Sequence, residues 1–191
     1  NGTVGTLLLD PTDIYIVDST GDFNITSTSP FEATSNLYPI SELTIGTLLS
    51  ALSYSNVIVT TESTANGTGN IYVETPISSS STNSLTLQAN NNIIIGYPIS
   101  LQGSLILQAQ GLIQNQQSFK NAINISAANI ITNAPIQTNG ANIILQATGN
   151  ILLPSIGNVL STSEGVGILF LTSLMLGRVE LTSMLRIHCV P

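Results

Sequence analysis

The phrase Ser84-Leu-Thr-Leu-Gln-Ala89 returns twice further along the chain. It reappears as Ser104-Leu-Ile-Leu-Gln-Ala109, and again as Asn142-Ile-Ile-Leu-Gln-Ala147 after an interval close to twice the first. Two shorter phrases recur between these copies: a Pro-Ile pair beginning at Pro76, Pro98 and Pro135, and an Asn followed by aliphatic residues at Asn70, Asn92, Asn129 and Asn150. Each period therefore holds about three short β-type runs, separated by Gly, Asn or Pro turns.

A unit of this size cannot bury its own apolar face, so successive units must stack on one another. A single-stranded right-handed parallel β-helix, with one coil per repeat of about 19–20 residues, satisfies this requirement and makes the protein all-β. Alternation along the strands predicts an inward row of Leu85, Leu87, Leu105 and Leu107, with Thr86 and Ile106 pointing outward. An antiparallel β-sandwich explains the strand spacing but not the repeated Leu-Gln-Ala phrase. A leucine-rich repeat has a similar period, but its signature phrase is missing.

Asn and Gln are abundant throughout the stretch from Ser81 to Asn150. At the corners of a coil, Asn tolerates the left-handed backbone conformation. Stacked in register, its amide can also form hydrogen bonds with the copies above and below. The Asn-rich punctuation therefore predicts polar ladders along the stack.

The surface must be almost uncharged, since only 7% of the residues are charged and the net charge is −7. From Thr75 to Ser163 the only charged side chain is Lys120. Three basic residues cannot form a phosphate-binding patch, which argues against nucleic acid as a partner. The longest apolar stretch, Val166 to Leu176, is too short to span a bilayer, so no membrane insertion is expected.

Three regions follow from these patterns. Residues 1–60 are expected to form atypical β-helix coils, residues 61–164 regular coils, and residues 165–191 an anomalous tail that is a cap, another element or a frame-shifted reading. In the first region, Gly5 to Ile16 predicts two strands joined at Asp10-Pro11, and Gly21 to Tyr38 predicts a loop. One short helix near 41–53 is expected from the helical spacing of its leucines, with Ser41 as N-cap and Glu42 in its first turn.

The segment Gly5 to Ile16, with its Gly-Thr-Leu-Leu-Leu-Asp-Pro phrase, resembles the filamentous haemagglutinin-like exoproteins of two-partner secretion systems. The helix and strand from Ser41 to Thr60 are similar to the next step of that family. The resemblance covers roughly Gly2 to Gly157. It implies a secreted or bacterial cell-surface protein, exported through an outer-membrane β-barrel transporter that reads a secretion domain lying outside these residues. The resemblance also implies an elongated, monomeric stem that presents itself to a host or environmental surface or glycan.

Residues able to carry chemistry are few. Asp10, Asp13, Asp18 and Asp22 form the best acidic cluster, but their spacing fits no calcium loop, and turn formation explains Asp10 and Asp22. His188 and Cys189 are adjacent, so on a strand they would point apart and form no dyad. Asn-x-Ser/Thr triplets occur at Asn1, Asn24, Asn66 and Asn124, as expected by chance in this composition. The sequence therefore predicts no catalytic residue, no metal ligand and no cofactor.

These patterns favour a non-catalytic structural or adhesive stem. Two alternatives stay open. One is a carbohydrate-binding or carbohydrate-active β-helix, because polysaccharide lyases and hydrolases share the fold; against it, the regular coils offer almost no carboxylates. The other is a scaffold that precedes a distant effector domain.

Overall fold

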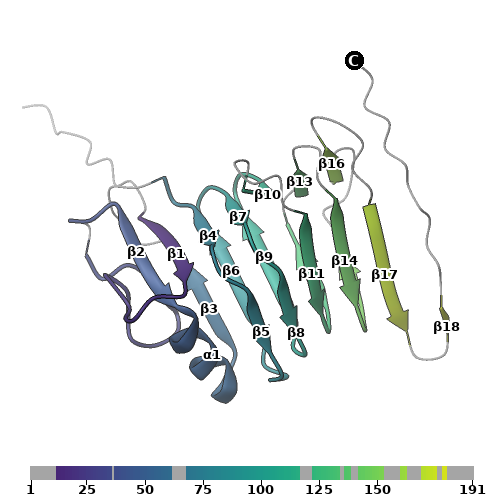
Figure 1. Cartoon of the computed structure of the whole chain (residues 1–191), viewed down its shortest axis with the longest axis horizontal. Helices are drawn as coiled ribbons and strands as arrows, with labels where there is room; N and C mark the ends of the chain where they lie inside the picture. Colours follow the sequence, from purple (N-terminus) through teal and green to yellow (C-terminus); the bar gives the residue numbers. More distant parts are fainter. Residues whose placement is uncertain are drawn as a thin grey trace, which may run out of the picture.

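A computed structural model of the chain describes residues 12–35, 37–61, 68–116, 122–133, 136–138, 142–152, 160–162, 169–175 and 178–179. Beyond Ile136, side chains are described only for residues 142–152. Nearly all the described secondary structure is β, with one α-helix, and the strands stack side by side along the long axis of the molecule (Figure 1). This arrangement is the parallel β-helix that the repeat predicts.

Three sheets form the faces of the solenoid, and their strands pair in parallel from coil to coil. The first sheet contains β1 (Asp13–Val17), β2 (Ile40–Thr44), β4 (Ile71–Val73), β7 (Ile93–Ile95), β10 (Ile113–Asn115), β13 (Ile136–Thr138) and β16 (Leu160–Thr162). The second contains β5 (Ile77–Ser79), β8 (Ile99–Leu101), β11 (Ile123–Ala127), β14 (Ile143–Ala147), β17 (Leu169–Met175) and β18 (Arg178–Val179), of which β18 alone is antiparallel. The third contains β3 (Val57–Thr60), β6 (Leu85–Ala89), β9 (Leu105–Ala109), β12 (Ile130–Thr132) and β15 (Ile151–Leu152). The right-handed winding stays a prediction, supported by the general handedness of parallel crossovers.

The core consists of aliphatic columns in which each side chain stacks on its register partner in the next coil. In the first sheet one column runs through fully buried isoleucines: Ile14, Ile71, Ile93, Ile113 and Ile136. In the third sheet the inward row Leu85, Leu87, Leu105 and Leu107 is fully buried, which confirms the alternation expected from the sequence. Thr86 and Ile106 lie between these leucines and are half-buried on the outer face.

The coils are less uniform than the repeat implies. Leu85 pairs with Leu105, one sequence period away, but Ile99 pairs with Ile125 across a longer interval. A strict sequence period would also place the third Leu-Gln-Ala copy in the wrong sheet. It forms β14 in the second sheet, beside β11, whereas the first two copies form β6 and β9 in the third sheet. The longest strand of the coil therefore moves from one face to the next between β9 and β11.

The expected helix is present but begins later than predicted. Helix α1 spans Ile45–Tyr54, and its N-cap is Thr44, whose Oγ1 accepts a hydrogen bond from the Thr47 N–H at 3.2 Å. The assignment of Ser41 as N-cap is wrong, because Ser41 and Glu42 lie in β2. Ser41 is fully buried there, and its hydroxyl donates to the Asn24 carbonyl at 2.7 Å.

Helix α1 follows β2, precedes β3, and packs against both strands and β5 (Figure 1). It therefore covers the second sheet at the point where that sheet ends. The inward side of α1 buries Leu48 and Leu52 completely. Its last turn is tied to the next coil, because Ser81 Oγ and Asn83 Nδ2 both donate to the Leu52 carbonyl, at 2.7 and 2.8 Å.

The outer edge of β2 is closed by the segment from Gly21 to Asn24. The backbones of Phe23 and Glu42 exchange two hydrogen bonds of 2.8 and 2.9 Å as an isolated antiparallel bridge. Asp22 accepts from the Thr44 N–H at 2.7 Å, and the amide of Asn24, the only non-glycine residue with positive φ among those described, donates to the Ile40 carbonyl at 3.3 Å. The predicted loop therefore covers the edge of β2 with a series of hydrogen bonds.

The outer edge of β3 is closed in the same way by residues further along that loop. Phe31, fully buried, donates to the Ile58 carbonyl at 2.8 Å and accepts from the Thr60 N–H at 2.9 Å. The Ser29 hydroxyl oxygen accepts from the Ile58 N–H at 2.8 Å. Exposed sheet edges are templates for unwanted strand pairing, so these contacts leave the first coil without an open edge at β2 or β3.

Candidate functional surface

The aspartate cluster considered for calcium is not brought together by the fold. Asp13 accepts from the backbone N–H groups of Thr68 and Asn70, at 3.0 and 2.8 Å, and so holds the chain entering β4. Asp22 faces α1, where its second oxygen accepts from the Thr47 hydroxyl at 2.7 Å and its charge favours the helix N-terminus. Asp18 is exposed, and Asp10 lies outside the described residues. Among the residues that are described, no three His, Cys, Asp or Glu side chains are grouped to hold a metal ion.

The asparagines of the Asn-x-Ser/Thr triplets, His188 and Cys189 are the other candidate residues, and the structure describes only some of them. Asn24 is engaged in the loop, where its amide nitrogen donates to the Ser35 carbonyl and the Ser41 hydroxyl at 3.0 and 3.1 Å. Asn124 is exposed on β11. Asn1, Asn66, His188 and Cys189 lie outside the described part of the chain, as does the strand expected at Gly5.

Asparagines placed just before strands form the predicted ladder, but with a different partner. Their side-chain oxygens accept from backbone N–H groups of the next coil: Asn56 from Ser84, Asn70 from Asn92, Asn92 from Leu112, and Asn129 from Asn150, at distances of 2.7–3.1 Å. Direct amide-to-amide stacking is represented by Gln110 Nε2, which donates to Asn90 Oδ1 at 2.9 Å. Left-handed asparagines are not found at the described corners of the coils. The ladder thus joins side chain to backbone and needs no special conformation.

Gly111 lies so close to the asparagine ladder that a larger residue would not fit there. A Cβ added to Gly111 would lie 2.2 Å from Asn92 Oδ1, closer than atoms approach without a shift. The missing side chain at Gly111 lets the Asn92 amide reach the Leu112 N–H across the coil boundary.

Two tyrosines stack on the outer face of the first sheet. Tyr15 and Tyr72 are register partners, with ring centroids 4.4 Å apart and planes 6° from parallel. Partial burial raises the pKa of Tyr15 to about 12, with smaller contributions from Tyr72 and from the nearby negative charges of Asp13 and Glu74. Tyr15 therefore stays protonated to a more alkaline pH than an ordinary tyrosine.

A small polar groove lies where the third sheet turns toward the first. Amide side chains line this groove of about 270 Å³ above two alanines, and we call them the amide corner: Gln88, Asn90, Gln108, Gln110 and Asn133, over Ala89 and Ala109. Gln88 and Gln108 are register partners on β6 and β9. Asn133 Oδ1 accepts from the Ala109 N–H at 2.8 Å, which fixes one side of the groove. The corner can donate and accept hydrogen bonds but carries no charge.

The third sheet also carries an aliphatic row on its outer face. Register places Ile58, Ile106, Ile131 and Leu152 in line on successive strands, with Thr86 between the first two. Ile58 is 40% exposed and Leu152 is 54% exposed. The outer row of the second sheet differs, because Ser78, Ser100 and Ser126 occupy it and border a shallow groove of about 610 Å³.

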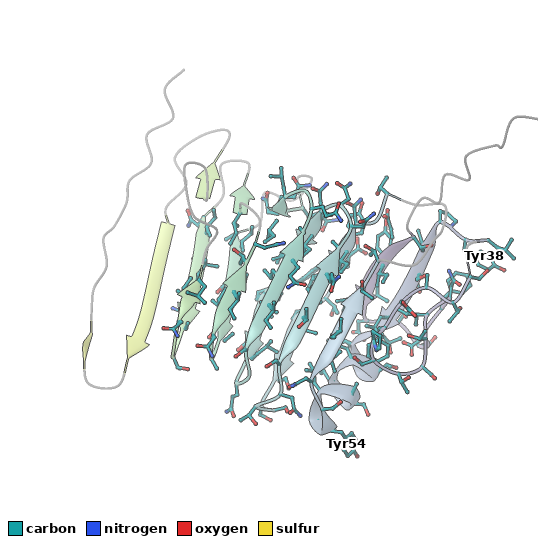
Figure 2. All side chains as sticks on the ribbon, turned by 180° about the vertical axis from the view of Figure 1, so that it is seen from behind. Tyr38 and Tyr54 are labelled. Atoms are coloured by element: carbon teal, nitrogen blue, oxygen red, sulfur yellow. The ribbon has the colours of Figure 1, made fainter. Side chains whose placement is uncertain are left out.

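Two of the most exposed aromatic rings, Tyr38 and Tyr54, lie near the N-terminal end of the stack (Figure 2). Tyr54 is at the last position of α1, and Tyr38 packs edge-on against Phe23, with ring centroids 5.0 Å apart. The amide corner belongs to other elements, namely β6 and β9 and the turns that follow β6, β9 and β12.

Comparisons with known proteins add no relative: no family model, curated protein or solved structure matches the chain. No helix in the described part of the chain is long and apolar enough to cross a membrane. The class that the fold defines is therefore a parallel β-helix repeat protein, and the haemagglutinin-like assignment stays a prediction from the resemblance.

Proposed function

We propose that the chain is a non-catalytic stem of a secreted or cell-surface adhesin of the haemagglutinin-like kind. The supporting observation is the continuous stack of coils, whose register partners on the outer faces are mostly Ser, Thr, Gln or aliphatic residues. Each coil is held by its two neighbours through strand pairing and the asparagine ladder. A solenoid built this way gains length by adding coils, with stability roughly proportional to their number.

The uncharged surface also supports a stem. Equivalent positions in adjacent coils lie about 4.8 Å apart, so a charge repeated from coil to coil would repel its copies. The ends of a stem must resist edge-to-edge association, and the bridges of Phe23 and Phe31 close two sheet edges at the N-terminal end of the stack. Export through an outer-membrane β-barrel transporter, and a monomeric stem that meets a host or environmental surface, complete the proposal.

External display can be tested on cells that produce the protein. Intact cells are treated with a protease, and the chain is followed with an antibody raised against residues 68–152. A surface stem is degraded or released while a cytoplasmic marker survives. Survival of the chain until the cells are lysed would contradict display.

The non-catalytic part has a separate test. The purified chain is incubated with neutral and acidic polysaccharides, and the formation of reducing ends and unsaturated products is measured. Sustained release that grows with protein concentration would overturn this part of the proposal and favour a carbohydrate-active β-helix.

A further inference from the structure

The outer face of the third sheet carries both the aliphatic row and amide side chains of the amide corner. The aliphatic row supplies exposed C–H surface along the axis of the stack. Two residues further along the same strands, Gln88 and Gln108 begin the amide corner. The aliphatic row and the amide corner therefore run beside each other across successive coils.

One amide of the corner, that of Gln108, retains hydrogen-bonding capacity toward a ligand. Gln108 is exposed, and its amide makes no hydrogen bond with another described residue. Gln110 is exposed as well, and its nitrogen donates to Asn90 Oδ1 at 2.9 Å. An amide offers a donor and an acceptor side by side, the arrangement that neighbouring hydroxyl groups of a sugar can satisfy. Buried Ala89 and Ala109 keep the floor of the groove low.

We propose that the aliphatic row and the amide corner together bind a linear, uncharged polysaccharide that lies along the solenoid axis. This inference rests on the proposed adhesive stem and names its ligand class. Binding sites commonly join apolar walls to a few polar groups that fix orientation. The C–H face of each sugar would lie on the aliphatic row, and its hydroxyls would meet the amides. The strand spacing of about 4.8 Å would place successive sugars near successive coils.

Charge selects a neutral ligand over an acidic one. From Thr75 to Ser163 the only charged residue is Lys120, which lies outside the described residues. An anionic polysaccharide would find no described counter-charge on these coils. On the second sheet, Ser78, Ser100 and Ser126 stand where the third sheet has its aliphatic row, so the serine groove provides an internal control.

The test uses the purified full chain and isothermal titration with cellohexaose, maltohexaose and chitohexaose, with a heparin hexasaccharide as the acidic probe. We expect saturable binding of at least one neutral probe and none of heparin. Gln108→Ala should weaken binding up to about tenfold, as expected for a lost hydrogen bond at the ligand. The matched control is Gln102→Ala, an exposed glutamine bordering the serine groove, which should leave the affinity unchanged.

Three results would overturn the inference. These are no binding of any neutral probe, equal losses from the two glutamine variants, and preferential binding of heparin. Sedimentation of the free chain adds a fourth: self-association abolished by Ile106→Lys would show that a second copy covers this face. If protease treatment of cells shows external display while all neutral probes fail, the stem stands and the glycan inference alone is lost.

Discussion

Removing the amide of Asn92 should loosen the joint between two coils without touching the aliphatic core. Asn92 precedes β7, and its Oδ1 accepts from the Leu112 N–H, just before β10, at 2.7 Å. Replacement by Ala leaves that N–H without its acceptor. The backbone N–H of residue 92 still donates to Asn70 Oδ1 in the variant, so the preceding hydrogen bond of the ladder is preserved.

The expected loss follows from the environment of this bond. A buried N–H deprived of its partner costs about 1–3 kcal/mol, and Asn92 is only partly buried, so water can replace some of the interaction. We expect a loss near the lower end, about 1–1.5 kcal/mol in the free energy of unfolding. Because each coil contacts only its neighbours, amide protection should fall mainly around β7 and β10.

Urea unfolding followed by circular dichroism measures the loss, and hydrogen exchange locates it. Asn91→Ala is the matched control, because Asn91 is the adjacent residue of the same type and its side chain makes no hydrogen bond with a described residue. Equal destabilisation by the two variants, or none from Asn92→Ala, would refute the role assigned to the ladder.

Other changes test the core, the ionisation and the sealed edge. Leu107→Ala should cost about 2–5 kcal/mol in urea unfolding, because Leu107 is fully buried, and clearly more than the outward Ile106→Ala. Tyr15 should ionise near pH 12, so its stabilising contribution is complete below pH about 10 and is lost as the pH rises toward 12. In an alkaline titration followed by tyrosinate absorbance, the ionisation step near pH 12 should be missing from the Tyr15→Phe variant. Ser29→Ala should raise the hydrogen-exchange rate of the Ile58 amide, since the serine oxygen is its acceptor at 2.8 Å, and an unchanged rate would show that the edge is closed by other groups.

Much of the fold could be predicted from local pattern. Apolar alternation correctly placed the leucines of β6 and β9 inside, and the Asn-plus-aliphatic runs correctly marked β4, β7, β12 and β15. The face occupied by a strand was less predictable. The phrase ending at Ala147 shares its last four residues, Ile-Leu-Gln-Ala, with the phrase ending at Ala109, yet it lies in another sheet.

Long-range contacts explain the remaining differences. The helix start was wrong because Ser41, Glu42 and Leu43 are extended and pair with β1, so α1 begins only after Thr44, which ends β2 and caps the helix. The capping role of Asp22 depends on a contact with Thr44, far along the chain, which spacing alone does not reveal. The amide corner did leave a signal, since Gln88 and Gln108 recur at the coil period, but its groove exists only once the coils stack.

The most direct test of the stacked coils uses spin labels on exposed or half-buried outer positions, with Cys189→Ser in the background. Labels at Ser126→Cys and Gln146→Cys, register partners on β11 and β14, should show strong dipolar broadening because the strands lie about 5 Å apart. Labels at Gln108→Cys and Gln146→Cys should broaden weakly, since these residues lie on different sheets. A reversed pattern, with the two glutamine positions close and Ser126 distant, would contradict the three-sheet solenoid.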